Sequence, residues 1–115
     1  MRQIAQTNKV SMEELTLDQA QQEVDQWIRT IGKGYFSELT NLGILMEEVG
    51  ELSRILVRRY GDQKSKPGDL AKSLEEEMAD VLWVLLALAN QTGVDLTAAL
   101  RESMQKKTSR DKDRF

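Results

Sequence analysis

The stretch that decides the fold is LGILMEEVGELSRILVRR, residues 42–59. It contains no proline, and its apolar residues recur at three- and four-residue steps, which is the spacing of one face of an amphipathic helix. These residues are Leu42, Leu45, Met46, Val49, Leu52 and Leu56. The pattern therefore predicts a helix that continues to about Tyr60.

Three acidic residues interrupt this apolar pattern: Glu47, Glu48 and Glu51. On a helix they are neighbours at i,i+3 and i,i+4, and Ile44 and Ile55 fall on the same side, one turn away on each flank. The acids thus lie in an apolar face rather than on a solvated ridge. Because like charges at this spacing destabilise a helix by roughly a few tenths of a kcal/mol each, we expect a cation to offset their repulsion.

A second acidic cluster, EEEMAD at residues 75–80, precedes the apolar run 81–89. Within it Glu77 and Asp80 are again i,i+3 neighbours. Either cluster alone is common on solvated helices. Two such helices that pair antiparallel would bring at least four carboxylates together, and this convergence is the arrangement that the sequence predicts.

The composition excludes several kinds of chemistry. The chain has 115 residues and a net charge of −3, without the basic surplus that is typical of nucleic-acid-binding domains. It contains no Cys and no His, which excludes disulfides, thiolate ligands, imidazole ligands and a His general base. Clusters that offer only carboxylate oxygens favour a hard cation, and Mg²⁺ binds to a few carboxylates together with waters and substrate phosphates.

Helical patterns also dominate the rest of the chain. A capping box at Thr16 opens a helix that ends near Gly32, and Ser37 or Thr40 can cap the helix that follows. Asp95 can cap a further helix after a third one, which is expected to span about 70–91. The pattern predicts an all-α fold, a small four-helix bundle-like subunit with short loops.

The remaining segments complete the expected organisation. Residues 1–11 lack a periodic pattern and are expected to be a flexible tail, so that one domain covers 12–115. Residues 61–69 are rich in Gly, Asp and Lys and are expected to be a loop. Residues 105–115 are mostly charged and are expected to form a tail.

The apolar run 81–89 predicts an assembly. A helix that is apolar on nearly every side is covered on every side, and four short helices cannot supply this cover. We therefore expect self-association, as a homodimer or a dimer of dimers. The run is too short to span a bilayer, and the N-terminus lacks the apolar region of a signal peptide, so we expect a soluble cytoplasmic protein.

The order of these motifs resembles a known family. Glu47 followed by E-V-G-E-L at residues 48–52, then E-x-x-D at residues 77–80 before an apolar run, is similar to the MazG-type nucleotide pyrophosphohydrolases of the all-α NTP pyrophosphatase superfamily. The resemblance covers about residues 17–115. The segments at 34–37, 59–61 and 110–114 also look like the short, single-domain bacterial branch of this family.

This resemblance implies Mg²⁺-dependent hydrolysis of a nucleoside triphosphate between its α and β phosphates, with Mn²⁺ able to replace Mg²⁺. It assigns the metal ligands to Glu48, Glu51, Glu77 and Asp80. Glu47 matches the first acid of the motif and is a candidate, with Glu48, to hold or deprotonate the attacking water. The alternative for Glu47 is a solvent-facing residue that only aids solubility.

Other residues are candidates for substrate contacts. Lys106 and Arg110 are expected to meet the triphosphate, although a solvated charged tail is an equal alternative. Tyr35 and Phe36 are expected near the site, either against the base or as a hydrophobic lid. Trp27 and Trp83 fall within helical patterns, so core packing is favoured over base stacking for both.

Three other functions fit the same residues. The acids could decorate a non-catalytic helical interaction module, and a nucleotide-binding regulatory protein could keep the metal site without turnover. A phosphohydrolase that releases orthophosphate is a third alternative. Partners other than nucleotide and self, such as nucleic acid or membrane, are not expected.

Overall fold

The computed structural model describes residues 14–62 and 73–114. In these residues it has four helices and no strand: α2 (Leu17–Thr30), α3 (Glu38–Tyr60), α4 (Leu74–Thr92) and α5 (Leu96–Asp111). The predicted all-α class is therefore confirmed. The expected N-terminal tail and most of the expected loop at 61–69 lie outside the described residues.

Each helix follows a residue whose side chain accepts a hydrogen bond from a backbone amide in the first turn of the helix. Thr16 and Ser73 form capping boxes with Gln19 and Glu76, in which each side chain bonds to the other residue's backbone. Ser37, and not Thr40, caps α3. Asp95 caps α5, as predicted from its position. These local signals fix where each helix starts and hence where its acidic residues lie.

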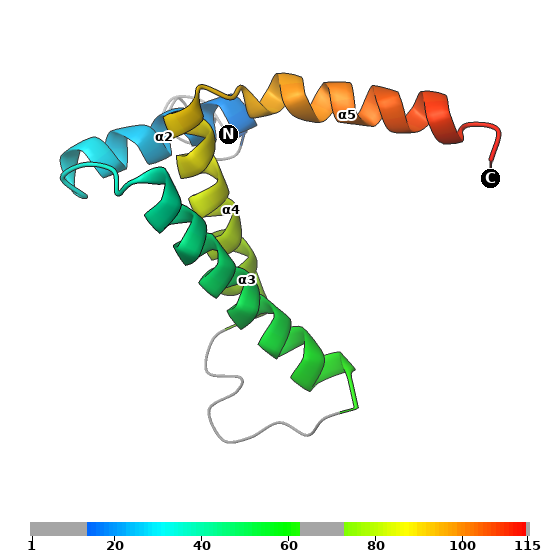
Figure 1. Ribbon diagram of the computed structural model, residues 1–115, viewed down its shortest axis with the longest axis horizontal. Helices are drawn as coiled ribbons and strands as arrows, with labels where there is room; N and C mark the ends of the chain where they lie inside the picture. Colours follow the sequence, from blue (N-terminus) through cyan, green and yellow to red (C-terminus); the bar gives the residue numbers. More distant parts are fainter. Residues whose placement is uncertain (1–13, 63–72, 115) are drawn as a thin grey trace, which may run out of the picture.

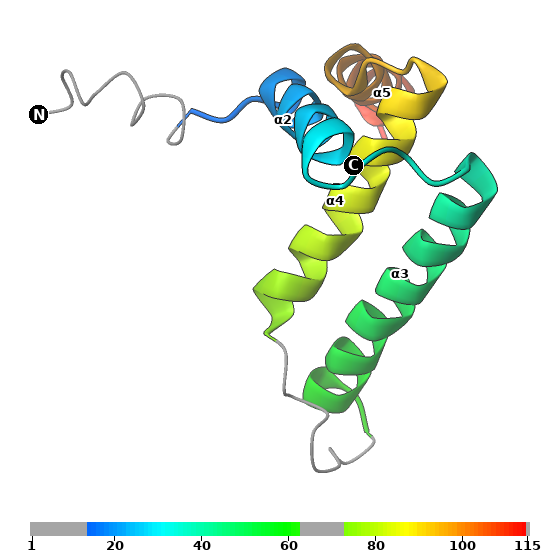
Figure 2. The ribbon, with the colours of Figure 1, turned by 90° about the vertical axis from the view of Figure 1, so that its left-hand side faces the viewer.

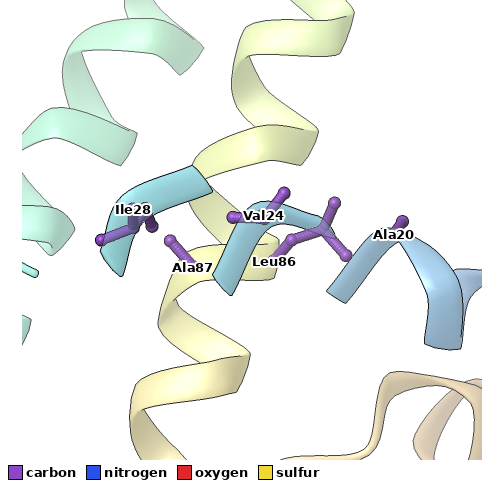
Figure 3. Close-up of a cluster of buried hydrophobic side chains, with 5 residues drawn as sticks. All are labelled: Ala20, Val24, Ile28, Leu86 and Ala87. Carbon is purple, nitrogen blue, oxygen red and sulfur yellow. The ribbon is translucent and has the colours of Figure 1, made fainter. Parts of the chain in front are cut away.

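The helices α3 and α4 lie side by side and run antiparallel, and α2 crosses the C-terminal half of α4 (Figures 1 and 2). The core of this crossing is small. Figure 3 shows side chains of α2 pointing toward side chains of α4; the buried cluster consists of Ala20, Val24, Ile28, Leu86 and Ala87. Burial of such aliphatic groups is the main term that holds α2 in place.

A buried amide joins three helices at the same end of the molecule. The Nε2 of Gln21 donates to the Oδ1 of Asn90 over 3.2 Å and to the carbonyl of Val94 over 2.9 Å, while the backbone amide of Leu96 donates to its Oε1 over 3.0 Å. Gln21 thus satisfies groups at the end of α4 and the start of α5.

The fourth helix leaves the bundle. Gly93 ends α4 in the left-handed conformation, with φ 73°, and α5 is bent by 104° from α4. It contacts mainly α2 and projects away from the α3–α4 pair (Figure 1). The charged segment that the sequence marked as a tail is helical to Asp111. The radius of gyration, 17.8 Å, exceeds the roughly 13 Å of a compact 100-residue domain.

Among the described residues, no single helix combines the length and apolarity of a membrane span; the sharply bent pair of α4 and α5 is the one combination that passes on length and composition.

Candidate functional site

The antiparallel pairing of α3 and α4 brings acidic residues from both helices together. Glu48 and Glu51 of α3 and Glu77 of α4 each place one carboxylate oxygen within 4.8 Å of the others. Glu77 is 1% exposed and lies between the helices, Glu48 is half-buried, and Glu51 is exposed at the rim. The predicted convergence of the two clusters is thus present for these three residues.

The buried acid is the deepest part of this cluster. Glu77 takes part in polar or ionic interactions, whereas its Oε2 atom is buried and accepts no hydrogen bond from the described residues. An oxygen-only donor set of this kind suits a hard divalent cation better than a soft one. The residues present therefore fit the metal that the sequence implied.

Two further acids of the motifs lie beside this cluster rather than in it. Asp80 is half-buried on α4, one turn after Glu77, and is not one of the three residues whose oxygens converge. Glu47 is exposed on α3. The structure thus separates the five predicted acids into a converged trio and two flanking residues.

The two basic residues expected at the triphosphate lie on α5, away from the acids of the same subunit (Figure 1). The Nζ of Lys106 lies 3.2 Å from a carboxylate oxygen of Glu102, and Arg110 pairs with Asp111 over 2.6 Å. Lys106, Glu102 and Arg110 are exposed, whereas Asp111 is half-buried. Within one subunit the structure does not bring these cations to the carboxylates.

The same pair of helices, α3 and α4, also lines a half-enclosed cavity of about 260 Å³. Its walls come from α2, the α2–α3 connection, α3 and α4, and include both predicted aromatic residues of that connection, Tyr35 and Phe36. Ile44 and Val84 also line it, and each is one turn from an acid of the motifs, Glu48 or Asp80 respectively. The apolar cavity and the acidic residues thus lie along the same pair of helices, α3 and α4.

The two tryptophans form one wall of this cavity. The rings of Trp27 and Trp83 meet edge to face, with centroids 5.6 Å apart and an interplanar angle of 87°. They are 46% and 38% exposed, so they pack against each other rather than inside a closed core. Gly32 leaves room for this wall, because a Cβ there would lie 3.1 Å from the Trp27 ring.

Tyr35 is held in the cavity wall by α2. Its hydroxyl donates to the Oδ1 of Asp25 over 2.6 Å, and the guanidinium of Arg29 lies 5.5 Å from its ring centroid. Burial, together with the bond to Asp25, raises the pKa of Tyr35, and the same bond lowers the pKa of Asp25 below its ordinary value of 3.8. The aromatic connection is therefore fixed to the preceding helix.

We expect Tyr35→Phe to destabilise the fold by about 1 kcal/mol, because the bond to Asp25 is lost. The stability that Asp25 contributes is present above its ordinary pKa and is lost as pH falls through the lowered pKa of the folded state. The variant should therefore lose less stability than wild type on acidification below about pH 4. Urea unfolding at neutral and acidic pH measures both effects. Tyr60→Phe, at a 69% exposed residue, is the control and should change neither.

Sequence reasoning missed a buried amide in the cavity wall. Asn41 is 7% exposed and lines the cavity from the first turn of α3. Its Nδ2 donates to the Oε1 of Gln91 on α4 over 2.8 Å. An amide directly before the apolar stripe of residues 42–56 was the available signal, since a polar residue on the inward face of a helix needs a buried partner.

Two antiparallel helices that hold a carboxylate cluster and line an aromatic cavity define an all-α protein suited to a hard cation and a flat apolar group. Residues 36–115 match the family model described as the MazG nucleotide pyrophosphohydrolase domain. The chain belongs to this family. It is accordingly a hydrolase that acts on nucleotides.

Relatives cover nearly the whole chain. YpjD of Bacillus subtilis (strain 168) is 43% identical over 104 residues, which are 90% of this chain and 94% of YpjD. YvdC of the same organism is 30% identical over 99 residues, covering 76% of this chain and 92% of YvdC.

Solved structures agree with the fold. The crystal structure of YpjD has a TM-score of 0.73 at 44% identity, covering 84% of this chain and 96% of that one. The Bacillus-conserved MazG protein, a nucleotide pyrophosphohydrolase, has a TM-score of 0.68 at 40% identity, covering 85% and 95%.

Proposed function

We propose that the protein is a Mg²⁺-dependent pyrophosphohydrolase that cleaves a nucleoside triphosphate between the α and β phosphates and releases the monophosphate and pyrophosphate. Its task would be to remove non-standard or surplus nucleotides from the cytoplasmic pool. The observation that carries the proposal is the convergence of Glu48, Glu51 and Glu77 within 4.8 Å, in a chain of the MazG family.

In this proposal Glu48, Glu51 and Glu77 hold the cation, and Asp80 joins them from the next turn of α4. Bound there, Mg²⁺ would neutralise charge on phosphoryl oxygens and lower the pKa of a bound water. Glu47 is exposed on the neighbouring position of α3, where its carboxylate can hold or deprotonate the attacking water, with Glu48 as the second candidate. In a chain without His, a carboxylate is the available general base.

The cavity orients the substrate. Ile44 in its wall is one turn from Glu48 along α3, and Val84 is one turn from Asp80 and about two turns from Glu77 along α4. A base in the cavity would therefore direct the attached phosphates toward the acids. Tyr35 and Phe36 would contact this base. Phe36 is 64% exposed and is free of the constraint that holds Tyr35, which suits a contact that forms when substrate enters.

Self-association is part of the proposal. The face of α3 opposite the acids carries an exposed apolar stripe, which consists of Leu42, Met46, Val49, Leu56 and Tyr60. Gly43 and Gly50 lie beside it, and a methyl group at either would meet no atom within 4 Å. A mid-helix glycine costs about 1 kcal/mol relative to alanine. The close approach of another helix would explain why glycine stands at both positions.

The occupant we propose for this stripe is a second copy of the chain. Glu38 lies at one end of α3 and Arg59 at the other, so two antiparallel copies of α3 place opposite charges beside each other. Assembly would also give α5 a role, because Lys106 and Arg110 do not reach the acids of their own subunit. In the assembly they would meet the triphosphate at a neighbouring site.

The deciding experiment is a panel of NTPs and dNTPs with Mg²⁺, in which pyrophosphate and orthophosphate are measured separately. We expect pyrophosphate from at least one substrate and none with EDTA. Orthophosphate as the first product would contradict the cleavage position. Binding without turnover would identify a regulatory protein, and the absence of Mg²⁺ binding in calorimetry would favour a non-catalytic module.

Metal binding should also be visible in stability. Mg²⁺ should raise the melting temperature, because it binds the folded state preferentially. Glu51→Gln should stabilise the metal-free protein by about 1 kcal/mol, since it removes one of several like charges that repel across a short distance. Thermal melts of both proteins in EDTA and in millimolar Mg²⁺ test this. A melting temperature in EDTA that is lower for the variant than for wild type, with no shift by Mg²⁺ in either protein, would contradict this. It would indicate that the acids are solvated and hold no cation.

A further inference from the structure

The side-chain amide of Asn41, in the cavity wall, has one fixed orientation, which follows from its contact with the amide of Gln91. The backbone carbonyl of Phe36 can only accept a hydrogen bond, and the side chain of Gln91 lies 2.6 Å from it, so the group that faces the carbonyl is the Nε2 of Gln91. The other end of the same amide, Oε1, must then accept from Asn41. Hence Nδ2 of Asn41 faces Gln91, and this assignment follows from donor and acceptor chemistry.

The remaining polar atom of Asn41 is an acceptor. Its Nδ2 donates to Gln91 and makes a longer contact of 3.5 Å with the Phe36 carbonyl. Among the described residues, both side-chain hydrogen bonds of Asn41 go through Nδ2 and none goes to Oδ1. The residue lines a cavity whose other walls are mainly aromatic and aliphatic. Ligand pockets of this kind obtain their specificity from a small number of fixed polar groups.

We propose that Asn41 is the residue that selects the base, and that its Oδ1 accepts from an exocyclic amino group of the nucleobase. Because its NH₂ is held by α4 and the α2–α3 connection, the amide cannot turn to offer a donor instead. A keto oxygen at the same place would face Oδ1 as a second acceptor and would be repelled. The ring N–H of uracil and thymine could donate to Oδ1, but it lies between two keto oxygens, which would then also come close to Oδ1. Amino-substituted bases are thus favoured over uracil and thymine. This inference rests on the proposed function, in which the cavity holds the base.

The cavity contains its own reporter. Both tryptophans of the chain, Trp27 and Trp83, line it, so quenching of the intrinsic fluorescence reports occupancy. We would titrate the protein in EDTA with cytidine, with its analogue that lacks the 4-amino group, with uridine, and with adenosine against purine riboside. Nucleosides carry no phosphate, so the measurement is independent of metal binding and turnover. Loss of pyrophosphatase activity and loss of base selection are therefore separate outcomes.

For the wild type we expect cytidine and adenosine to bind about ten-fold more tightly than the analogues without the amino group, as for one hydrogen bond to a fixed acceptor. Asn41→Leu, which keeps the size and removes the acceptor, should bring these ratios close to one. Gln91→Met frees the amide to turn and should reduce them too. Thr40→Val, at the exposed neighbouring position, is the matched control and should leave them unchanged.

The result that would overturn the proposal is equal binding of each nucleoside and its deamino analogue by the wild type. Two others would do the same: ratios that persist in Asn41→Leu, and no quenching by any nucleoside when equilibrium dialysis also finds no binding. The wild-type ratios decide the question even if a variant fails to fold. A purely structural Asn41 would change stability in the variants but not the ratio between two nucleosides.

Discussion

Glu51→Gln should lower the rate of pyrophosphate release by at least about two orders of magnitude. Glu51 supplies one of the three carboxylate oxygens that lie within 4.8 Å of one another, and a misplacement of the cation by about 1 Å is enough for a loss on the order of 10²-fold. Gln keeps the size and the α3 helix, so the loss should appear in activity and not in folding. Steady-state assays with saturating Mg²⁺ measure it.

The matched control is Glu75→Gln. Glu75 lies in the first turn of α4, close in sequence to Glu77, but it is exposed and is not a member of the converged trio. The Glu75→Gln variant loses the same charge as Glu51→Gln and should retain nearly full activity. Equal activity of Glu51→Gln and Glu75→Gln would remove Glu51 from the site. Asp80→Asn should behave as Glu51→Gln does if Asp80 completes the ligand set.

The second large effect concerns assembly. Val49→Asp places a charge at the centre of the exposed stripe on α3, where the wild-type side chain is 46% exposed in the isolated subunit. If a second copy covers this stripe, the buried unpaired charge should weaken the free energy of association by several kcal/mol. Light scattering at micromolar concentration would then show a monomer. Gln26→Asp, on an exposed part of α2, should leave the assembly intact.

Two outcomes would contradict this prediction. A wild-type monomer at micromolar concentration would remove self-association, and an unchanged assembly of Val49→Asp would move the interface elsewhere. The outer face of α4, where Leu82 is 45% exposed, is the next surface to test with Leu82→Asp. If α5 serves a neighbouring site, a mixture of Glu51→Gln with a variant that lacks the charges of Lys106 and Arg110 should regain activity.

The local sequence was sufficient to predict four helices and to bring Glu48 and Glu51 together, but it did not predict that α5 continues to Asp111. Helix starts depend on side chains within three residues, as at Thr16 and Asp95, and so they could be predicted from sequence alone. The spacing of Glu48 and Glu51 follows directly from helix geometry. The contribution of Glu77 required one more assumption, antiparallel pairing of the two helices, which the local spacing of residues does not encode.

Other features depend on contacts between residues far apart in sequence. The burial of Glu77 depends on the pairing of α3 with α4, and the departure of α5 depends on the bend after Gly93. The cavity beside Trp27 and Trp83 depends on how α2 crosses α4. The bond between Asn41 and Gln91 spans fifty residues. Periodicity reports which face of a helix is apolar but not which element covers that face, so the tryptophans could be assigned to packing but not to a cavity wall.

The sequence by itself determined that this chain is all-α, that it carries two sets of acids at helical spacing, and that any metal they hold meets oxygen ligands, because these properties follow from local spacing and from the absence of His and Cys. Only the tertiary structure decided that three of the acids converge while Glu47 and Asp80 flank them, and that the cations of α5 lie away from them. The reason is that helix pairing and the bend after Gly93 set distances between residues that no local pattern encodes.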